Sequence, residues 1–555
     1  MKILGIGGTT HDYSYCVMND ENILIAIEEE RISREKHSQG LRSKLHRGIQ
    51  YCLQNNDLIQ NYDDINLIIS NDAFDLNHNV ESKIIDRMVK INHHMAHAAS
   101  TFYLSPFKES AILVMDGGGS YFSQRFNESC SLGYAQNNNI SFFQKIYGKV
   151  RNLYNIEIFK DEPNTVEQIF ESNSCSIPLL YLLMTEACGF KTLQEGKTMG
   201  LAPYGKDTYV KMFSDYMVVV EENNKINIDI DYMGLVNCLQ EIARYDQRDR
   251  FLVKADIAYA TQHNFEQAVF FVMNYLHKKT GSKNLCFSGG AALNSVLNGK
   301  IKNNTKFENV CIIPAPADSG TAIGAALYGY YNIYGNKRRN YEPLKNMFYG
   351  KSYNDDEVEK VIDSFQNKVQ FSKYDGSELY KRTAQYISEG KIIGWFQGGS
   401  EFGPRALGNR SILADPRNKD MKDILNKKVK FREHFRPFAP VVLRSQVHDY
   451  FDTDFPDNDF MLFVGHVKEH AKKLIPAVTH IDGSARLQTV TENSNLKLFR
   501  LLEEFKKITG IPVLINTSFN IKGRPIVEKP MHAMEAFMHC EMDILVLNNY
   551  IISKK

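Results

Sequence analysis

Three residues, His93, His97 and Asp116, have the types and spacing expected of metal ligands. The stretch from 91 to 103 contains several alanines and no glycine or proline, which predicts a helix. Because residues four apart share one face of a helix, His93 and His97 can bind the same ion. Taken alone, the pair is more simply interpreted as part of a solvated, histidine-rich helix.

The residues after this pair favour the metal interpretation. An apolar run from 111 to 115 predicts a buried strand that ends at Asp116. The next residues are Gly117, Gly118 and Gly119. Glycines let a ligand approach the backbone, and a carboxylate beside them is where a metal would meet phosphate groups. The sequence therefore predicts a metal site at a phosphate-binding corner.

Two later segments suit the same site. Gly289 and Gly290 stand between a predicted strand and a helical start, where backbone N–H groups can face a phosphate or a ribose. Asp318 follows another predicted strand and precedes a helix that opens near Gly320. As a fourth ligand, Asp318 would give two imidazoles and two carboxylates, a set suited to divalent Fe, Mn or Zn. A helix N-cap is an equally good interpretation of Asp318.

Residues 2–31 and 111–147 follow one plan of strand, open corner, strand, turn and strand. The first corner contains His11 and Asp12, and the second contains Asp116 and the three glycines. Paired hairpins with open corners are typical of actin-like, sugar-kinase and Hsp70-type ATPases, which hold a phosphate chain from both sides.

Composition limits the range of functions. The 555 residues are 43% hydrophobic and 24% charged, enough for two or more cores, and the formal net charge of +1 gives no bulk positive field. The nine cysteines are scattered without a CxxC pair, which indicates reduced thiols. No apolar run is long enough for a signal peptide or a membrane span. We expect a soluble, cytoplasmic protein with no nucleic-acid or membrane partner.

A charged segment at 334–346 predicts a linker between a domain at 1–340 and a C-terminal domain at 347–555. Guanidinium groups and small polar side chains gather in the C-terminal domain, a combination that suits a phosphorylated small molecule. Single ion pairs, or a surface for single-stranded nucleic acid at 431–438, are the alternatives, and the balanced charge disfavours the latter. The candidates are Arg405, Arg410, Arg417, Lys430, Arg432, Arg436, Arg486, Asn516, Thr517, Ser518, Asn520 and Arg524.

Eleven segments carry a family resemblance. They are GGTTHDYSY (7–15), EEERISREKH (28–37), NHHMAHAAS (92–100), MDGGG (115–119), EGKTMGLAPYG (195–205), FSGGAALN (287–294), PADSGTAIGAAL (316–327), GGSEFGPRALGNRSILADPR (398–417), REHFRPFAP (432–440), DGSARLQTV (482–490) and LINTSFN (514–520). On these segments the chain resembles the NodU/CmcH family of O-carbamoyltransferases. The resemblance implies α/β and α+β architecture. It predicts an actin-like ATPase (ASKHA) N-terminal domain, like that of the tRNA threonylcarbamoyl-adenosine transferase, and a YrdC-like C-terminal domain.

The resemblance also implies a reaction. The C-terminal site would make carbamoyl-adenylate from carbamoyl phosphate and ATP, with Mg²⁺ accompanying the nucleotide. The N-terminal site would transfer the carbamoyl group to a hydroxyl of a small acceptor, a natural product or a saccharide, with the help of Fe²⁺ or another divalent first-row metal. A homodimer is left open.

The implied site residues fall into four sets. The metal ligands would be His93, His97, Asp116 and Asp318. His11 and Lys36 would lie at the transfer centre. The N-terminal nucleotide contacts would be Gly117, Gly118, Gly119, Gly289, Gly290 and Asn294. Carbamoyl phosphate and nucleotide would be held in the C-terminal domain by Arg405, Lys430, Arg436, Arg486, Asn516 and Ser518.

Several alternatives stay open at this stage. His11 is either the general base for the acceptor hydroxyl or a structural histidine at a phosphate corner. The main rival function is threonylcarbamoyl-adenosine synthesis on tRNA, which the near-neutral charge disfavours. A nucleotide-gated protein of the actin or Hsp70 type needs no imidazole-bound metal, and a sugar kinase leaves the arginine-rich second domain unexplained.

Overall fold

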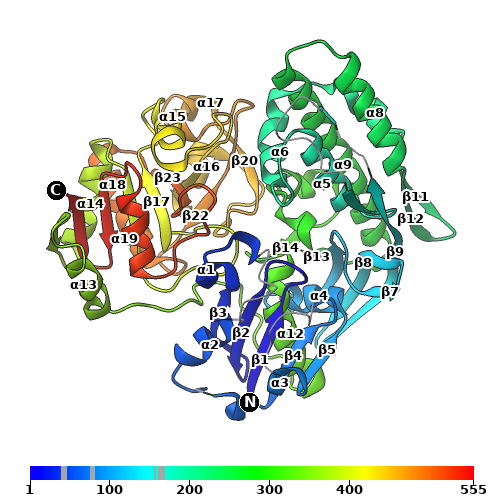
Figure 1. The fold of residues 1–555 in the computed structure, drawn as a ribbon, viewed down its shortest axis with the longest axis horizontal. Helices are drawn as coiled ribbons and strands as arrows, with labels where there is room; N and C mark the ends of the chain where they lie inside the picture. The colour runs from blue at the N-terminus through cyan, green and yellow to red at the C-terminus, as the bar shows by residue number, and fades with distance from the viewer. Residues whose placement is uncertain (39–46, 60, 75–81, 155–157, 160–168) are drawn as a thin grey trace. The chain divides into compact units, whose positions relative to one another are not determined.

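The computed structural model describes residues 1–38, 47–59, 61–74, 82–154, 158–159 and 169–555, with mixed α/β content (Figure 1). The chain forms two compact units. The first comprises Met1–Ser70, Phe74–Val89 and Pro343–Lys555, and the second Asn71–Ala73 and Lys90–Glu342. The chain passes from the second unit to the first within the segment predicted as a linker. Because the first 70 residues belong to the same unit as the C-terminal part, the units do not follow sequence order. The domains at 1–340 and 347–555 stay a prediction.

A five-stranded sheet occupies the start of the chain, in the order β3-β2-β1-β4-β5. Its strands are β1 (Lys2–Gly7), β2 (Ser14–Asn19), β3 (Asn22–Glu28), β4 (Leu67–Asn71) and β5 (Met88–Ile91). Strand β1 is antiparallel to β2 and parallel to β4, and β2 is antiparallel to β3. Aliphatic and aromatic side chains of this sheet and of helix α2 (Arg47–Gln54) form one buried cluster. The short helix α3 (Ser82–Ile85) precedes β5.

The last of the three strands predicted within residues 2–31, which corresponds to β3, ends earlier than its sequence pattern indicates. The chain enters helix α1 (Glu29–Ser33) instead of continuing as a strand to Arg31. Glu29 is buried in this helix and accepts a hydrogen bond from the backbone N–H of Gly48 at 2.8 Å. The helical turn also buries Arg31 completely. The helical turn thus gives each of these buried charged side chains hydrogen-bond partners, Gly48 for Glu29 and Glu28 for Arg31.

The second unit contains a larger sheet, whose main path is β10-β9-β8-β6-β13-β14, with β7 paired to β8. Its strands are β6 (Glu109–Met115), β7 (Tyr121–Ser123), β8 (Phe126–Gln136), β9 (Asn139–Tyr154), β10 (Ile169–Asn173), β13 (Asn284–Ser288) and β14 (Asn309–Cys311). The order β9-β8-β6-β13-β14 repeats the order of the first sheet, with antiparallel hairpins followed by a parallel neighbour. This repetition confirms the strand–corner–strand plan predicted for residues 2–31 and 111–147.

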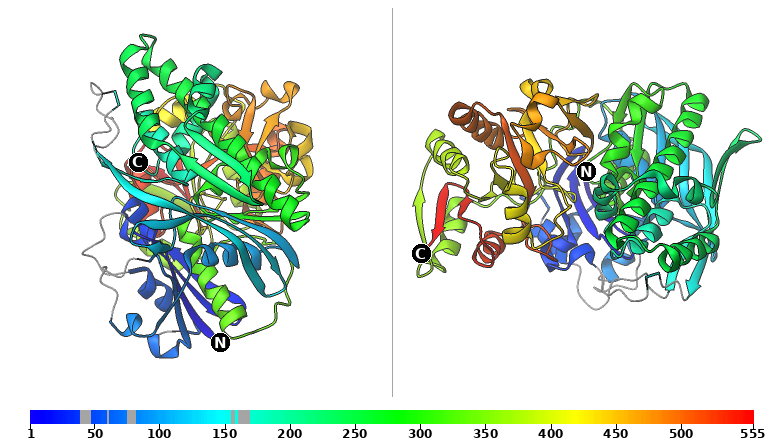
Figure 2. Two further views of the ribbon diagram at one scale, coloured as in Figure 1. Left: turned by 90° about the vertical axis from the view of Figure 1, so that its right-hand side faces the viewer. Right: turned by 90° about the horizontal axis from the view of Figure 1, so that it is seen from above.

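Helices lie on the two sides of this second sheet (Figures 1 and 2). Helices α4 (His93–Tyr103) and α12 (Thr321–Tyr328) pack together, and α4 also contacts β6 and β13. Helix α9 (Arg250–Thr280) contacts β6 and β8 and packs against α5 (Ile177–Ala187). The remaining α-helices and strands of the unit are α6 (Glu195–Leu201), α7 (Val210–Ser214), α8 (Tyr232–Tyr245), α10 (Ser295–Gly299), α11 (Ile301–Asn304), β11 (Met217–Glu222) and β12 (Lys225–Ile230).

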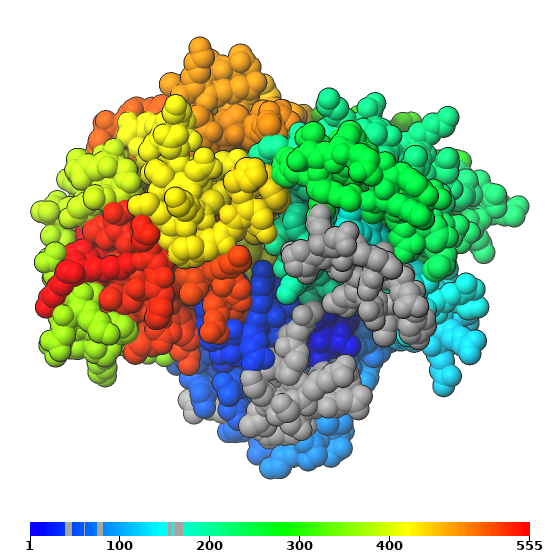
Figure 3. All heavy atoms as spheres, turned by 45° about the horizontal axis from the view of Figure 1, so that its top comes forward, coloured from blue at the N-terminus to red at the C-terminus, as the bar shows by residue number. Residues whose placement is uncertain are grey.

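The C-terminal part is built on an eight-stranded mixed sheet in the order β15-β25-β24-β16-β17-β23-β18-β22. The strands are β15 (Val369–Lys373), β16 (Ile393–Phe396), β17 (Arg410–Ala414), β18 (Ala439–Leu443), β22 (Gln488–Val490), β23 (Val513–Ser518), β24 (Ile544–Leu547) and β25 (Tyr550–Lys554). The last residues of the chain (red) lie beside yellow-green residues of the early C-terminal part, as the β15–β25 pairing requires (Figure 3). Trp395 is fully buried in this core.

Helices and a small sheet complete the C-terminal part. The helices are α13 (Asp355–Asp363), α14 (Ser377–Ser388), α15 (Met421–Leu425), α16 (Val447–Tyr450), α17 (Glu469–Lys472), α18 (Leu496–Thr509) and α19 (Pro530–Met538). The small sheet contains β19 (Phe451–Asp452), β20 (Val464–Val467) and β21 (Ser484–Arg486). Among the described residues, no helix combines the length and apolar composition needed to span a membrane.

Candidate functional site

Helix α4 presents two histidines on one face. The side chain of Asn92 caps the helix by accepting a hydrogen bond from the backbone N–H of Met95 at 3.1 Å. His93 and His97, one turn apart, are fully buried, and their Nε2 atoms are 3.0 Å apart. The predicted helix is therefore confirmed. The alternative of a solvated, histidine-rich helix is wrong, because the intervening His94 is fully buried too.

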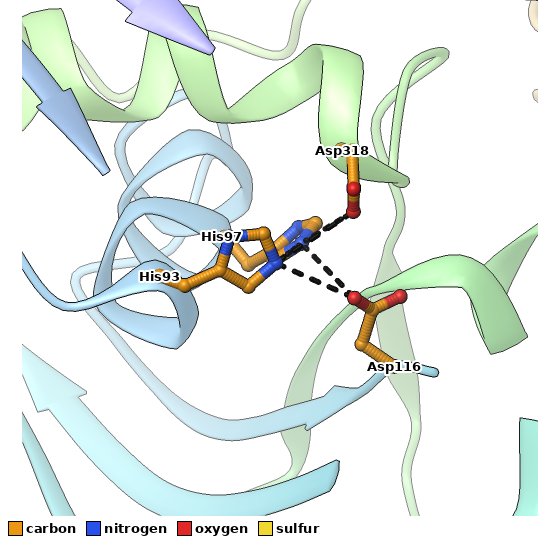
Figure 4. Close-up of side chains that lie close together, drawn as sticks. All are labelled: His93, His97, Asp116 and Asp318. Atoms are coloured by element: carbon orange, nitrogen blue, oxygen red, sulfur yellow. Dashed lines mark hydrogen bonds and ion pairs between the residues drawn. The ribbon is translucent and has the colours of Figure 1, made fainter. Parts of the chain in front are cut away.

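Two carboxylates point at this pair from different elements (Figure 4). Asp116 follows β6, and its Oδ2 lies 3.3 Å from His93 Nε2 and 3.9 Å from His97 Nε2. Asp318 begins the 3₁₀ turn η7 (Asp318–Gly320), and its Oδ1 lies 3.6 Å from each Nε2. Two atoms bound to one ion at about 2.0–2.2 Å lie at most about 4.4 Å apart. The separations between the two histidines and between each histidine and each aspartate satisfy that limit, and the whole set of four ligand atoms lies within 4.8 Å.

Neighbouring groups orient two of the four side chains. His93 Nδ1 lies 3.2 Å from Asn71 Oδ1, which fixes a proton on Nδ1 and leaves the Nε2 lone pair facing the cluster. Asp116 Oδ1 accepts a hydrogen bond from the backbone N–H of Gly290 at 2.7 Å, so only Oδ2 faces the histidines. Sequence reasoning missed Asn71, which stands at the end of β4 with no local motif to mark it.

The buried charges of this cluster need positive counter-charge. Burial opposes charge on His93, but the hydrogen bond with Asp116 and the negative charges of Asp318 and Asp116 raise its pKa. Burial and Asp318 act to raise the pKa of Asp116, but His93 and His97 outweigh them and lower it. Two buried carboxylates facing two imidazoles need either bound protons or a metal ion. The donor set therefore fits a divalent first-row ion.

His94 lies outside this cluster although it stands between the two candidate ligands. Its Nδ1 lies 2.7 Å from Ser131 Oγ, on the side of strand β8. Burial lowers the pKa of His94 to about 3, so the imidazole is neutral at physiological pH. His94 therefore supplies a natural control for tests of the metal cluster.

The glycines and asparagine predicted to bind nucleotide have packing roles in the structure. A Cβ at Gly119 would meet Glu128 and His94 at 2.9 Å, and one at Gly289 would meet the β6 backbone at 2.2 Å. Gly117 and Gly118 lie between Asp116 and Gly119 in the same corner. Asn294 caps α10 through its Oδ1, and its Nδ2 donates to Gln262 at 2.8 Å. Nucleotide binding by these six residues stays a prediction.

His11 lies in the first unit, in a short polar network. Its Nδ1 is 3.0 Å from Asp12 Oδ2, while His37 Nδ1 is 2.9 Å from Asp12 Oδ1. Burial acts to raise the pKa of Asp12, but hydrogen bonds with His11 and His37 lower it well below its usual value. Lys36 is exposed in the adjoining 3₁₀ turn η1 (Lys36–Ser38). A shared transfer centre of His11, Lys36 and the metal cluster stays a prediction.

Sequence reasoning did not assign roles to Asp12 and His37. Asp12 adopts a φ of 53°, uncommon for a residue with a side chain. Its backbone N–H donates to His37 O at 2.8 Å. Backbone strain at a polar corner is the kind of feature that marks functional sites, but it is not visible in the sequence.

The C-terminal part brings the predicted phosphate ligands together. Lys430 ends the π-helical turn η9 (Asn426–Lys430), and its buried Nζ donates to Asn520 Oδ1 at 2.8 Å and Ser518 Oγ at 3.2 Å. Asn516 Nδ2 donates to Gln488 Oε1 at 2.7 Å and to Ala406 O at 3.2 Å. The Oδ1 of Asn516 is buried without a hydrogen-bond partner among the described residues.

Several arginines in the same region lack acidic partners. Arg405 and Arg486 form no ion pair with any described residue, and Arg486 Nε is buried without a hydrogen bond. Burial and the charge of Arg436 lower the pKa of Arg405 to about 10. Burial and the charges of Arg405, Arg432 and Arg436 lower the pKa of Arg486 well below its usual value. Partly buried cations that repel one another form a site that an anion would stabilise.

Two other candidate arginines have different surroundings. Arg410 is fully buried, with its guanidinium 3.5 Å from the centre of the Phe396 ring. Arg417 forms an ion pair with Asp415 at 2.6 Å. Arg417 is therefore engaged in a local ion pair, and anion binding by the other candidate cations stays a prediction.

Comparison with known proteins places both parts of the chain in one family. Residues 2–87 and 73–327 match the family described as Carbamoyltransferase N-terminus, and residues 384–554 match Carbamoyltransferase C-terminus. Together these matches cover most of the chain.

Curated relatives include two nodulation proteins. Nodulation protein NolNO of Sinorhizobium fredii is 32% identical over 98% of this chain and 79% of its own length. Nodulation protein NolO of Bradyrhizobium diazoefficiens is 33% identical over 84% of this chain and 79% of its own length. Among solved structures, full-length HypF in its phosphate- and nucleotide-bound form aligns at 16% identity. The alignment covers 59% of this chain and 55% of HypF, and its TM-score of 0.40 is too low to establish a common fold. From the family matches and the nodulation relatives, this chain belongs to the carbamoyltransferase family.

Proposed function

We propose that this transferase uses carbamoyl phosphate and ATP to form carbamoyl-adenylate, and then carbamoylates a hydroxyl of a small-molecule acceptor. The observation that carries the proposal is the presence of two chemically different centres in one chain of this family. One is a cluster of cations suited to phosphates, in which Arg405 and Arg486 have no ion pair with any described residue, and the other is a buried cluster of two histidines and two aspartates.

The first step fits the cation cluster. Hydrolysis of carbamoyl phosphate releases phosphate and carbamate, and a carbamate oxygen then attacks the α-phosphorus of ATP, expelling pyrophosphate. Arg405, Arg436 and Arg486 would bind the phosphate oxygens, where guanidinium forks make paired hydrogen bonds. Lys430 would neutralise charge as pyrophosphate leaves. The unpartnered Oδ1 of Asn516 would accept a hydrogen bond from the carbamoyl NH₂ group.

The second step transfers the carbamoyl group. The acceptor oxygen attacks the carbamoyl carbon, the bond to AMP breaks, and the hydroxyl proton leaves. Nε2 of His11 would take this proton, because Nδ1 of the same ring faces Asp12. Lys36 would stabilise the negative charge of the departing phosphate.

The metal cluster serves the same step. Fe²⁺, or another divalent first-row ion held by His93, His97, Asp116 and Asp318, would supply Lewis acidity to the carbamoyl oxygen. The neighbouring groups prepare the site for it. Asn71 holds the His93 ring with Nε2 inward, and Gly290 holds Asp116 with Oδ2 inward.

The fold supports this assignment of roles. The repeated strand order of the two sheets is the pattern expected of an actin-like ATPase of the ASKHA class, which would bind ATP with Mg²⁺. We propose that the C-terminal part is YrdC-like. A small acceptor is proposed in place of tRNA, because a net charge of +1 gives little of the phosphate attraction that nucleic-acid binding needs. A cytoplasmic location without a membrane partner remains part of the proposal, and a homodimer is left open.

Pyrophosphate release tests the first step. The wild-type protein should release pyrophosphate from ATP only when carbamoyl phosphate is added. Removing one partner of a charged contact costs about 2–5 kcal/mol, so Arg486→Ala should slow release by at least about 30-fold. Arg417→Ala is the matched control, because Arg417 pairs with Asp415, and it should release pyrophosphate at nearly the wild-type rate. Release that is independent of carbamoyl phosphate, or unchanged in Arg486→Ala, would contradict the proposal.

A further inference from the structure

The loop that carries Arg405 is closed by one buried carboxylate. Glu401 is 1% exposed, and its Oε1 accepts three hydrogen bonds from the backbone. The donors are the N–H groups of Leu407 (2.7 Å), Asn409 (2.8 Å) and Arg410 (3.1 Å). Hydrogen bonds from several N–H groups to one carboxylate are strong and directional. Residues 401–410 therefore form a tight loop, with Arg405 between its two fixed ends.

Arg31 contacts the same loop from helix α1. Its guanidinium is fully buried, and Nη2 donates to Gly403 O at 2.6 Å while Nε donates to Glu28 Oε2 at 3.1 Å. Gly403 has a φ of 116°, a conformation that favours glycine, and it lies two residues before Arg405. The position of the Arg405 segment therefore depends on a residue from the first 35 of the chain.

Helix α1 is joined in turn to the His37 turn. The carboxylate of Glu30 accepts a hydrogen bond from the backbone N–H of His37 at 2.8 Å. His37 then contacts Asp12, the partner of His11. A continuous set of hydrogen bonds thus runs from Gly403, through Arg31 and α1, to the network that contains His11. All of these residues belong to the first unit.

We propose that Arg31 is a positioning residue that couples occupancy of the anion site to the turn carrying Lys36 and His37. The inference rests on the proposed binding of carbamoyl phosphate beside Arg405. An anion bound by Arg405 restrains the loop, and the bond between Gly403 and Arg31 transmits that restraint to α1. Coupling between two sites is reciprocal, so ordering the turn must also strengthen anion binding.

Arg34 provides a matched control on the same helix end. Its Nη1 donates to Ile526 O at 2.6 Å and its Nη2 to Pro525 O at 2.9 Å. Arg34 therefore makes two hydrogen bonds to the C-terminal part, where Arg31 makes one, but neither of them reaches residues 401–410. Arg34→Gln removes comparable contacts without touching the loop that carries Arg405.

The test compares Arg31→Gln with Arg34→Gln in the full-length protein. Carbamoyl phosphate affinity and hydrogen–deuterium exchange of the amides at 29–38 are measured with and without carbamoyl phosphate. In the wild type and in Arg34→Gln, the ligand should slow exchange of these amides. In Arg31→Gln the ligand should leave exchange unchanged, and affinity should fall by about tenfold, as expected for one lost charged hydrogen bond.

A second substitution at Arg31 keeps the test valid if Arg31→Gln fails to fold. Arg31→Lys keeps the buried positive charge but cannot bond Gly403 and Glu28 with one fork, so it should also lose the ligand-dependent protection. Protection and affinity like those of the wild type in the Arg31 variants, or equal losses in the Arg34 variant, would overturn the proposed coupling. Failure of the wild-type protein to bind carbamoyl phosphate would overturn the proposed function, and this inference with it.

Discussion

His97 is the residue through which metal binding can be tested most simply. Its Nε2 faces His93, Asp116 and Asp318, while its Nδ1 is buried without a hydrogen-bond partner among the described residues. The ring thus makes few other polar contacts that a substitution would disturb. By contrast, His93 is also tied to Asn71, so its removal would disturb more than the cluster.

We expect His97→Ala to lose its bound metal, because three ligands from this set hold a divalent ion far less tightly than four. Elemental analysis of anaerobically purified protein should find about one iron, zinc or manganese ion per wild-type chain and much less in the variant. His94→Gln is the control, because His94 faces Ser131, and it should retain the metal. Equal metal contents in the two variants would rule out this ligand set.

The Asp12–His37 pair should make stability depend on pH. Burial opposes charge on His37, but the hydrogen bond and charge of Asp12 raise its pKa, while the pKa of Asp12 is lowered. Because the pKa of His37 is higher in the folded state, its protonated ring stabilises the fold. This stabilisation is fully present below the pKa of the unfolded state, about 6.5, and is lost as the pH rises through the pKa of the folded state. The stability from Asp12 is present above about pH 4 and is lost only on acidification.

We therefore expect the stability difference between the wild type and Asp12→Asn to be largest near pH 5–6 and to shrink above about pH 6.5. Urea midpoints measured across this range report the difference. His37→Asn, which has no titrating group at this position, should flatten the same pH dependence. A difference that stays constant, or grows, between pH 6 and pH 9 would show that the pair does not act as described.

At the scale of elements, the packing of α4 against α12 positions the histidine–aspartate cluster. Helix α4 supplies both histidines, and the turn before α12 supplies Asp318. The two helices approach closely because residue 324 is glycine. A Cβ there would lie 1.8 Å from Ala96 O on α4, so the backbones would have to move apart. Close approach of the helices is therefore a requirement for the ligand geometry.

Gly324→Ala should consequently cost about 1–3 kcal/mol of stability, as overpacked cores do, and should weaken metal binding. Gly196→Ala is the control, because a Cβ at Gly196 in α6 meets nothing within 4 Å. That change should be neutral or should stabilise by about 0.4–1 kcal/mol. Thermal unfolding and metal titration report both effects. Wild-type metal affinity in Gly324→Ala would show that helix separation does not control the site.

At the scale of the whole molecule, each compact unit contains one of the two centres. The cation cluster and the His11 network belong to the first unit, and the histidine–aspartate cluster belongs to the second. Strand order repeats between the sheet that precedes the His11 corner and the sheet that precedes Asp116, whereas the cation cluster belongs with the eight-stranded sheet. Activation at the cation cluster and metal-assisted transfer, which also uses His11 and Lys36 of the first unit, are therefore proposed to depend on different residues, and mutations can separate them.

The sequence indicated the parts of this arrangement that depend on local pattern. The helix at His93, the strand before Asp116 and the repeated hairpins were predictable because periodicity and glycine corners act over a few residues. Contacts between distant segments were not. Nothing local signals that Arg31 bonds Gly403 or that Asn71 orients His93, because tertiary packing alone brings these pairs together. For the same reason, the grouping of residues 1–70 with the C-terminal part had no sequence signal.

Rescue with synthetic carbamoyl-adenylate distinguishes two separate centres from one. Acceptor carbamoylation is measured by mass spectrometry in Arg486→Ala and in Asp116→Ala, with and without the added intermediate. Carbamoyl-adenylate should restore product formation in Arg486→Ala, which lacks only the first step. It should not restore Asp116→Ala, which should still release pyrophosphate from ATP and carbamoyl phosphate. Rescue of Asp116→Ala, or failure of both variants at pyrophosphate release, would contradict the account and indicate a single composite site.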